Sequence, residues 1–380
     1  MRAFRPLFAT LLLLLPLASA FAAPPIAAYY DGRMPIAQIP AARLSYVIYA
    51  FAEPGDDNLC LKPTAVQRQQ FAELRQLRTA HPGLQLLVSI GGWDAAPQFS
   101  DLALTNASRT AFARSCIERY IVRQGFDGID LDWEFPVHGG TNESRPADRT
   151  HFTALVRAFR QQLDKLGRQR HYLLTAATPA GRWQQGGAYA VTDSYDLAAI
   201  APMLDWLNVM TYDMNNIFSP VSAFNTPLDA DPADPTPEPQ RQWDNLTAAV
   251  KFYEAHGVPA DKIMLGMAFY GRGFVGVSDT HAGLYSKYTG GYPQVPWKDI
   301  RAKFLTDPGW VRHWSETAQA PWLYNAAKHI FLTYDDPMSM AIKADFVRRQ
   351  HLKGAMFWVL GEDDAQHSLL NALISGLQGR

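Results

Sequence analysis

The stretch FDGIDLDWEF, residues 126–135, decides the fold expected of this chain. Its acids Asp130, Asp132 and Glu134 are spaced by two, and the residues between them are apolar. Side chains alternate between the two faces of a strand, so the three acids share one face. The opposite face carries Ile129, Leu131 and Trp133. The segment therefore predicts a strand whose apolar face meets covering helices and whose acidic face turns toward the interior of a barrel.

Short apolar runs like this one recur along the chain and alternate with longer amphipathic segments. The candidate strands are 26–30, 46–51, 85–90, 128–133, 172–177, 206–211, 263–269 and 354–359. Segments with helical periodicity are 64–79, 109–123, 148–166, 245–256 and 338–350. Strands that are apolar on both faces and alternate with helices indicate a parallel sheet. Eight such units predict an α/β fold, a (β/α)8 TIM barrel. A doubly wound open sheet is the alternative, but no Gly-x-Gly-x-x-Gly loop follows an early strand.

The spacing of these strands is regular except between the seventh and the eighth, where residues 274–331 leave room for far more than one helix. We expect a small α+β lobe inserted there into a barrel of residues 23–380. The stretch from 274 to 331 is rich in aromatic residues, which form either a core of the lobe or a wall of a cleft. They include Tyr285, Tyr288, Tyr292, Trp297, Trp310, Trp314 and Trp322.

The composition indicates a globular, exported protein. Of 380 residues, 48% are hydrophobic and 19% are charged, with a formal net charge of −1. There is thus no basic surplus of the kind that binds nucleic acid or anionic lipid. Residues 1–22 carry Arg2 and Arg5, then an apolar run, then small residues, which is typical of a secretory signal peptide. The run is shorter than the roughly 20 residues that a membrane anchor needs. We expect a secreted or periplasmic monomer with no nucleic-acid or membrane partner.

Cys60 and Cys116 are the only cysteines, which excludes a disulfide-rich scaffold and a cysteine-built zinc site. One bridge between them is possible in an oxidising compartment, but the sequence does not place their Cα atoms, so the pairing stays open. The ten histidines form no His-Glu-x-x-His motif or other ligand-like cluster. We expect neither a metal nor another cofactor.

The row of three acids indicates a catalytic site. Neighbouring carboxylates on one strand face, about 6–7 Å apart, repel by roughly 2–3 kcal/mol at an effective dielectric near 20. The acid at the carboxyl end of the strand, Glu134, can then keep its proton near neutral pH and act as a general acid. Barrel active sites lie at that end. A calcium loop starting at Asp130 is the alternative, but it needs Gly and an acid where Phe135 and Thr141 stand.

This acidic strand resembles the signature of glycoside hydrolase family 18, the chitinases and their relatives, and the likeness runs from about residue 26 to the C-terminus. Further segments match the family in type and order. They are Ser89-Ile90-Gly91-Gly92-Trp93, Met210-Thr211-Tyr212-Asp213, Tyr270-Gly271-Arg272, Tyr334-Asp335-Asp336-Pro337 and Trp358. One departure follows Asp213, where Met214-Asn215-Asn216 replaces a His-Gly-like segment of many members.

The resemblance implies a retaining hydrolase of chitin or chitooligosaccharides in which the substrate's own acetamido group is the nucleophile. It implies that Glu134 is the proton donor, that Asp132 orients the acetamido group and that Asp130 holds a shared proton. Tyr212 and Asp213 would hold the same sugar ring. The implied substrate-binding residues are Trp358, Tyr30, Phe51, Gly92, Trp93, Met210, Tyr270 and Arg272.

Two other functions remain possible at this point. A chitinase-like lectin on the same barrel typically lacks the terminal acid, whereas Glu134 is present here. An endo-β-N-acetylglucosaminidase acting on N-glycans is the second alternative, and the inserted lobe favours a linear chitin chain over it.

Overall fold

A computed structural model describes residues 23–380 apart from 56, 94–97, 139–143, 169 and 181–190. The predicted signal peptide, 1–22, lies outside the described residues. The described helices are all too short or too polar to span a bilayer.

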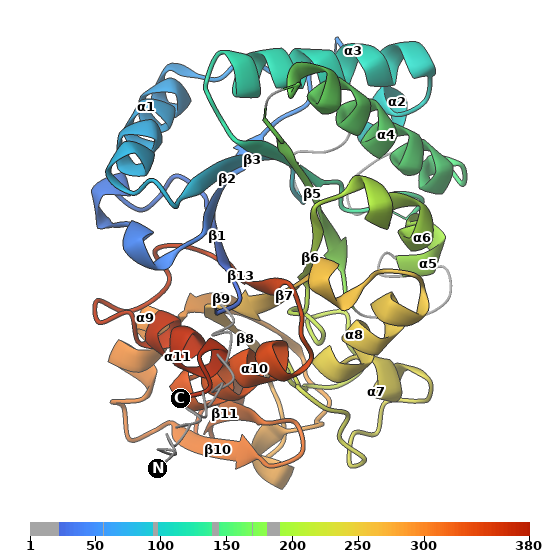
Figure 1. The fold of residues 1–380 in the computed structure, drawn as a ribbon. Helices are drawn as coiled ribbons and strands as arrows, with labels where there is room; N and C mark the ends of the chain where they lie inside the picture. The colour runs from blue at the N-terminus through green and yellow to red at the C-terminus, as the bar shows by residue number, and fades with distance from the viewer. Residues whose placement is uncertain (1–22, 56, 94–97, 139–143, 169, 181–190) are drawn as a thin grey trace, which may run out of the picture.

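Eight parallel strands close into a barrel, in the order β1-β13-β7-β6-β5-β4-β3-β2 (Figure 1). They are β1 (Ile26–Tyr30), β2 (Tyr46–Ala52), β3 (Gln85–Gly91), β4 (Gly128–Asp132), β5 (Leu173–Pro179), β6 (Trp206–Met210), β7 (Ile263–Ala268) and β13 (Gly354–Trp358). Each strand begins at its predicted residue except β5, which begins one residue later. The predicted (β/α)8 barrel is confirmed.

Helices surround the barrel and fill the connections between its strands (Figure 1). They are α1 (Ala65–Ala80), α2 (Phe99–Leu102), α3 (Asn106–Cys116), α4 (Asp148–Leu166), α5 (Val191–Ser194), α6 (Leu197–Ile200), α7 (Gln240–Trp243), α8 (Leu246–Ala255), α10 (Pro337–Arg349) and α11 (Ser368–Leu377). Helix α3 begins three residues before the predicted start because Thr105 and Ser108 form a capping box. It continues as the wider turn η3 (Ile117–Val122).

The period of two in β4 sorts its side chains as the sequence predicts. Ile129, Leu131 and Trp133 are fully buried in the cluster that joins the outer faces of the strands to the helices. The acids Asp130 and Asp132 are buried on the opposite face, inside the barrel. Burial of the apolar row fixes the register of β4, and the register in turn fixes where the acids point.

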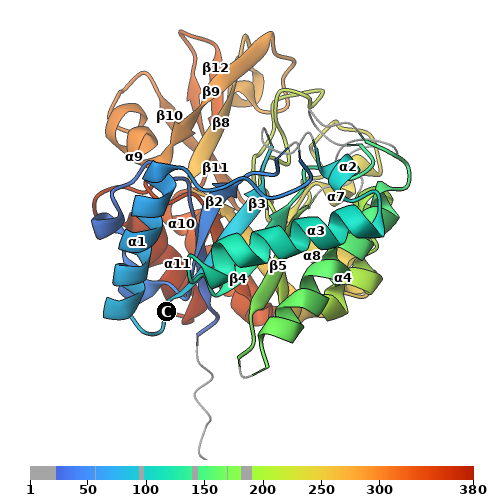
Figure 2. The same ribbon diagram turned by 90° about the horizontal axis from the view of Figure 1, so that it is seen from above.

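A five-stranded antiparallel sheet, ordered β10-β11-β12-β8-β9, is inserted between β7 and β13. Its strands are β8 (Tyr270–Val275), β9 (Gly290–Pro296), β10 (Val311–Ser315), β11 (Ala320–Asn325) and β12 (Ile330–Thr333), with the short helix α9 (Trp297–Asp299) after β9. Figure 2 shows this lobe standing on one end of the barrel. Because only one residue separates the end of β7 at Ala268 from the start of β8, the lobe starts at the carboxyl end of a barrel strand.

Of the aromatic residues between 274 and 331, some fill a core and others line a cavity or the surface. Trp322 lies in the core of the lobe with Phe274 and Phe331, and Tyr285 and Tyr288 pack against it. Trp297 and Trp310 join the main core instead, Tyr292 faces a cavity, and Trp314 lies under the guanidinium of Arg312. Most of this set therefore fills cores.

Cys60 and Cys116 form a disulfide bond with a Cα–Cα distance of 5.1 Å. It joins the segment after β2 to the end of α3 and closes a loop of 56 residues. In the loop-entropy description such a link lowers the conformational entropy of the unfolded chain and thereby stabilises the fold by about 4 kcal/mol.

The double variant Cys60→Ser/Cys116→Ser should lose about 2–4 kcal/mol in free energy of unfolding, measured by urea denaturation without reductant. An unchanged urea midpoint would contradict this, and wild type treated with reductant serves as the control.

Candidate active site

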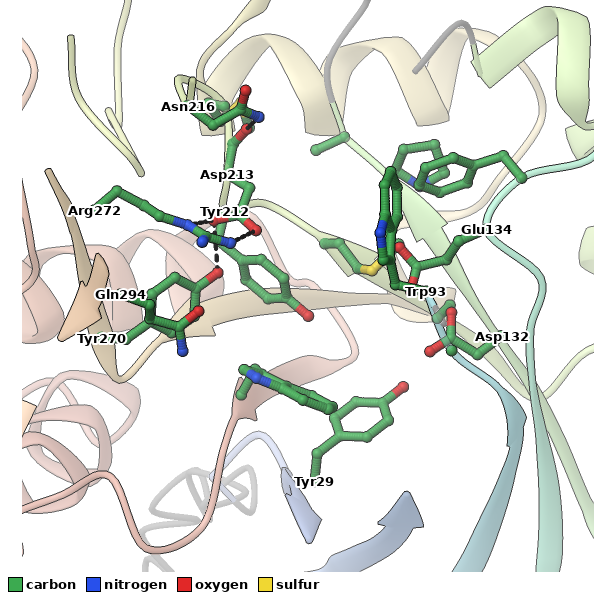
Figure 3. A pocket seen from close by; sticks show the side chains of 18 of the residues that line it. Tyr29, Trp93, Asp132, Glu134, Tyr212, Asp213, Asn216, Tyr270, Arg272 and Gln294 are labelled. Atoms are coloured by element: carbon green, nitrogen blue, oxygen red, sulfur yellow. Dashed lines mark hydrogen bonds and ion pairs between the residues drawn. The ribbon is translucent and has the colours of Figure 1, made fainter. Parts of the chain in front are cut away.

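A cavity of about 830 Å³ opens at the carboxyl ends of the barrel strands, with the inserted lobe as one of its walls (Figure 3). Most of the predicted site residues line it. They are Phe51, Gly92, Trp93, Asp132, Glu134, Met210, Tyr212, Asp213, Tyr270, Arg272 and Trp358. Side chains from many strands thus meet at one place, as expected for a barrel of this type.

Asp130 lies below the cavity, at the centre of the barrel, and is fully buried. Its Oδ2 accepts hydrogen bonds from Tyr29 at 2.9 Å and Ser89 at 2.8 Å. Its Oδ1 accepts from Thr175 at 2.6 Å and Asn208 at 3.1 Å. Burial raises the pKa of Asp130, and these four donors act against that rise. Donors from four other strands therefore hold this carboxylate in one orientation.

Asp132 is also buried, but its surroundings differ from those of Asp130. The residue is 3% exposed, and its Oδ1 has no hydrogen-bond partner in the described part of the chain. Burial, and then the neighbouring charges of Glu134 and Asp130, raise the pKa of Asp132 well above its usual range. Asp132 is therefore ready to take up a proton, and one of its oxygens is available to a donor that enters the cavity.

Glu134 stands two residues beyond Asp132, just past the end of β4, where its side chain is half-buried and lines the cavity. Figure 3 shows its carboxyl group on the same side of the cavity as Asp132. The side chain can meet a ligand in the cavity from this place, whereas Asp130 cannot. The three acids thus form a row that runs from the barrel centre to the cavity wall.

Two glycines after β3 allow this close packing. Gly91 has φ +119°, and a Cβ atom there would lie 2.1 Å from the carbonyl oxygen of Asp132. Gly92 has φ +88°, donates its N–H to the same carbonyl at 2.8 Å, and would place a Cβ 2.7 Å from the ring of Phe51. Only glycine fits both positions. The Gly91-Gly92 pair is therefore a packing requirement of the site.

On the lobe side, Asp213 is held by two residues of β8. Its carboxylate accepts from Tyr270 at 2.8 Å and from Arg272 Nε at 2.7 Å and Nη2 at 2.5 Å (Figure 3). Asp213 adopts φ +56°, and its own N–H donates to Asn225 at 2.8 Å. A two-point arginine–carboxylate pair is geometrically specific. It fixes the barrel end of β6 to the inserted sheet.

Tyr212 precedes this ion pair and projects into the cavity (Figure 3). Burial, followed by the charges of Asp132 and Glu134, raises the pKa of its hydroxyl well above the usual range. The hydroxyl therefore stays protonated and can donate a hydrogen bond. Figure 3 shows it pointing toward the side of the cavity that carries the acids.

Aromatic rings form the floor and part of the rim. Trp358, at the end of β13, stacks on Phe51 with a centroid distance of 5.7 Å and an interplanar angle of 22°. Tyr29, on the neighbouring strand β1, supports the indole at 5.5 Å. Trp93 is 37% exposed at the cavity and meets Phe135 edge-on. Such surfaces can stack against the apolar faces of sugar rings.

The prediction of Tyr30 as a substrate-binding residue is wrong. Tyr30 points to the outer face of β1, where its hydroxyl donates to the carbonyl of Met34 and its ring meets Tyr49. It belongs to the core between the barrel and the helices and does not line the cavity. Tyr29, one residue earlier, has the inward position, because successive side chains of a strand alternate.

Several residues of the site were not expected from the sequence. Tyr29, Ser89, Thr175 and Asn208 surround Asp130, and Asn216 and Gln294 line the cavity. Each contact to Asp130 joins β4 to another strand, and no spacing in the sequence shows which residues of two strands lie side by side. No group of three or more His, Cys, Asp or Glu side chains in the described ranges is placed to hold a metal ion.

Comparison with known proteins gives a family match and close relatives. The family described as Glycosyl hydrolases family 18 matches residues 25–363. Chitinase A1 of Niallia circulans is 38% identical over 303 residues, which are 77% of this chain and 42% of that protein. Chitotriosidase-1 of Mus musculus is 33% identical over 336 residues, 86% of this chain and 68% of that protein. The chain therefore spans less than half the length of Chitinase A1.

Solved structures agree with these relatives. A glycoside hydrolase family 18 N-acetylglucosaminidase from Paenibacillus barengoltzii has a TM-score of 0.82 at 33% identity, and the match covers 93% of this chain and 99% of that chain. Chitinase ChiA74 from Bacillus thuringiensis also has a TM-score of 0.82, at 29% identity, covering 94% of this chain and 70% of that chain.

Proposed function

Because this chain belongs to glycosyl hydrolase family 18, we propose that it is a chitinase that cleaves β-1,4 bonds between N-acetylglucosamine units of chitin. The observation that carries the proposal is the row of acids on β4, which ends with Glu134 in the wall of the cavity. The chitinases among its relatives support the same substrate class. We also propose export from the cytoplasm, on the signal-like sequence of residues 1–22.

In the proposed reaction the bond between C1 of one sugar and the bridging oxygen breaks. Glu134 gives its proton to that oxygen, and the carbonyl oxygen of the sugar's own 2-acetamido group forms a new bond to C1. The product of this step is a cyclic oxazolinium ion, and no enzyme nucleophile is used. A water molecule then attacks C1 while Glu134 takes its proton, so the acetamido bond to C1 breaks and the original configuration is retained.

Asp132 has the properties that the acetamido group requires. Its free Oδ1 can accept the acetamido N–H, and its charge offsets the positive charge that develops on the ring. Its raised pKa also allows it to exchange a proton with its neighbours on β4. Asp130 lies behind Asp132 in the row of acids, and four donors hold its carboxylate in one orientation.

Tyr212 and the aromatic floor complete the positioning of the substrate in this proposal. The protonated hydroxyl of Tyr212 donates to the acetamido carbonyl oxygen and keeps it directed at C1. Asp213, anchored to Arg272, keeps Tyr212 beside the lobe. Trp358 lies under the reacting sugar ring. Without an acetamido group the internal nucleophile is missing, so cellulose is not a substrate.

A second candidate is an N-acetylglucosaminidase that removes single sugars from a chain end. The likeness to the Paenibacillus barengoltzii enzyme, at 33% identity over nearly its whole chain, favours it. The chemistry at Glu134 is the same in both cases, and only the product lengths differ. The lectin alternative receives less support, because Glu134 is present and faces the cavity.

Digestion of chitohexaose and cellohexaose distinguishes these functions. We expect the wild type to cleave chitohexaose into dimers to tetramers early in the reaction, with the β-anomer formed first, and to leave cellohexaose intact. Chromatography gives the product lengths and proton NMR gives the anomers. Monomer as the sole early product would favour the N-acetylglucosaminidase. An initial α-anomer would contradict the retaining mechanism, and binding without any cleavage would favour the lectin.

A further inference from the structure

A hydrogen bond connects the wall of the active-site cavity to a buried acid behind it. Gln294, on β9, lines the cavity, and its Nε2 donates to Oε1 of Glu362 at 3.3 Å. Figure 3 shows Gln294 on the side of the cavity opposite Glu134. Glu362 follows β13 and lines a second cavity of about 620 Å³, whose lining shares no residue with the first. The Gln294–Glu362 pair is thus a link between the two cavities.

Glu362 is 5% exposed, and its Oε2 has no hydrogen-bond partner among the residues that the structure describes. Charged groups face it from two other elements. Arg33 Nη2 lies 3.8 Å from Oε1, with Asp31 beside it in the segment after β1, and Lys298 comes from α9. Burial raises the pKa of Glu362 to about 7, although Arg33, the hydrogen bond from Gln294 and Lys298 act against the rise.

We propose that Glu362 is a positioning residue of the active site, whose carboxylate fixes the direction of the Gln294 amide. A carboxylate only accepts hydrogen bonds, so it holds the NH2 group of Gln294 and leaves the amide carbonyl oxygen for the cavity. That oxygen accepts a hydrogen bond from a hydroxyl or N–H group of the bound chain of N-acetylated sugars. The proposal rests on the proposed function, since it requires a sugar chain in the cavity.

The charge of Glu362 then affects substrate binding. A protonated Glu362 carries an O–H donor and can meet either end of the Gln294 amide, so the preference for one direction is lost. One hydrogen bond to a neutral group changes binding by about two- to tenfold. The wild-type KM is expected to be lowest above pH 7 and to rise by about that factor as the pH falls through 7. The kcat should not share this step, because Glu362 does not touch the reacting atoms.

A double-mutant cycle on the full chain tests the proposal. Initial rates on chitotetraose are measured from pH 5 to 9 for wild type, Glu362→Gln, Gln294→Leu and the double variant. Glu362→Gln should raise KM at pH 8 by about two- to tenfold, keep kcat within about twofold and abolish the KM step near pH 7. Gln294→Leu should do the same. In the double variant the two effects should not add, because both act through one amide.

Asp363→Asn is the structural control. Asp363 accepts hydrogen bonds from the N–H groups of Leu369 and Leu370 at the start of α11 and does not contact Gln294. Its variant should have a lower melting temperature but keep the KM step. A wild-type KM without a step, or additive effects of Glu362→Gln and Gln294→Leu, would overturn the positioning role. Wild type that neither binds nor cleaves chitotetraose would overturn the proposed function as well, so the two failures are distinguishable.

Discussion

Replacing Glu134 by Gln is expected to lower kcat on chitotetraose by about 10³-fold or more, because general acid catalysis contributes roughly 10²–10⁴-fold and Glu134 is the member of the β4 row of acids that reaches furthest into the cavity wall. The amide has nearly the shape of the carboxyl group but cannot give a proton to the bridging oxygen. Stopped assays with chromatographic product detection measure the rate. Titration calorimetry should find the dissociation constant within about threefold of that of the wild type at the same pH.

The matched control is Glu254→Gln, the same chemical change at an exposed residue of α8 that is not part of the cavity lining. It should leave both kcat and the dissociation constant unchanged. Turnover by Glu134→Gln at the wild-type rate would remove the proton-donor role and with it the proposed mechanism. Loss of both binding and turnover would indicate a collapsed site, which the melting temperature of the variant would reveal.

Much of the barrel could be predicted because its signal is local. Strand β4 carries its own period of two, and the burial of Ile129, Leu131 and Trp133 follows from it. The alternation of short apolar runs with amphipathic helices repeats along the chain and predicts a closed parallel barrel. Helix α4 has the predicted bounds, since its apolar stripe is long and regular.

For the other strands, which residues point into the barrel and which point to the helices could not be predicted in the same way. In β1 all five residues from Ile26 to Tyr30 are buried, so no polar residue marks the inward face. The choice between Tyr29 and Tyr30 was therefore open to a shift of one residue, which moves a side chain from the barrel interior to the helix layer. In β4, by contrast, the charged residues on one face identify the side chains that point into the barrel.

Side-chain contacts between different strands were the other gap. The donors to Asp130 include Ser89, Thr175 and Asn208, each from a different strand, and no spacing in the sequence connects them. The same holds for the Gln294–Glu362 pair, which joins the lobe to the segment after β13 across 68 residues. Such pairings depend on the register of the closed barrel, which follows only from the folded structure.

Replacing Asp132 by Asn is expected to reduce kcat by about 10²–10³-fold, the usual effect of removing one group that stabilises charge in the transition state. The amide can still contact the acetamido group, but it cannot balance the positive charge of the oxazolinium ion or exchange a proton on β4. Because the ground state loses less than the transition state, KM should change by less than about threefold. A kcat within threefold of wild type would contradict the proposed role.

The melting temperature of Asp132→Asn gives an independent test of the same residue. The substitution that lowers kcat should raise the stability of the fold at neutral pH. The folded-state pKa of Asp132 is raised, chiefly by burial, so its contribution to stability is present at low pH and is lost as the pH rises from about 4 through that raised pKa. Asn does not titrate, so Asp132→Asn should melt above the wild type at pH 8, with the difference shrinking toward pH 4.

The control is Asp127→Asn at the other end of β4, where Arg78 and Arg170 pair with a buried carboxylate away from the cavity. That variant should melt below the wild type and keep its kcat, because its acid stabilises the fold, whereas Asp132 destabilises the fold at neutral pH and is retained for the reaction.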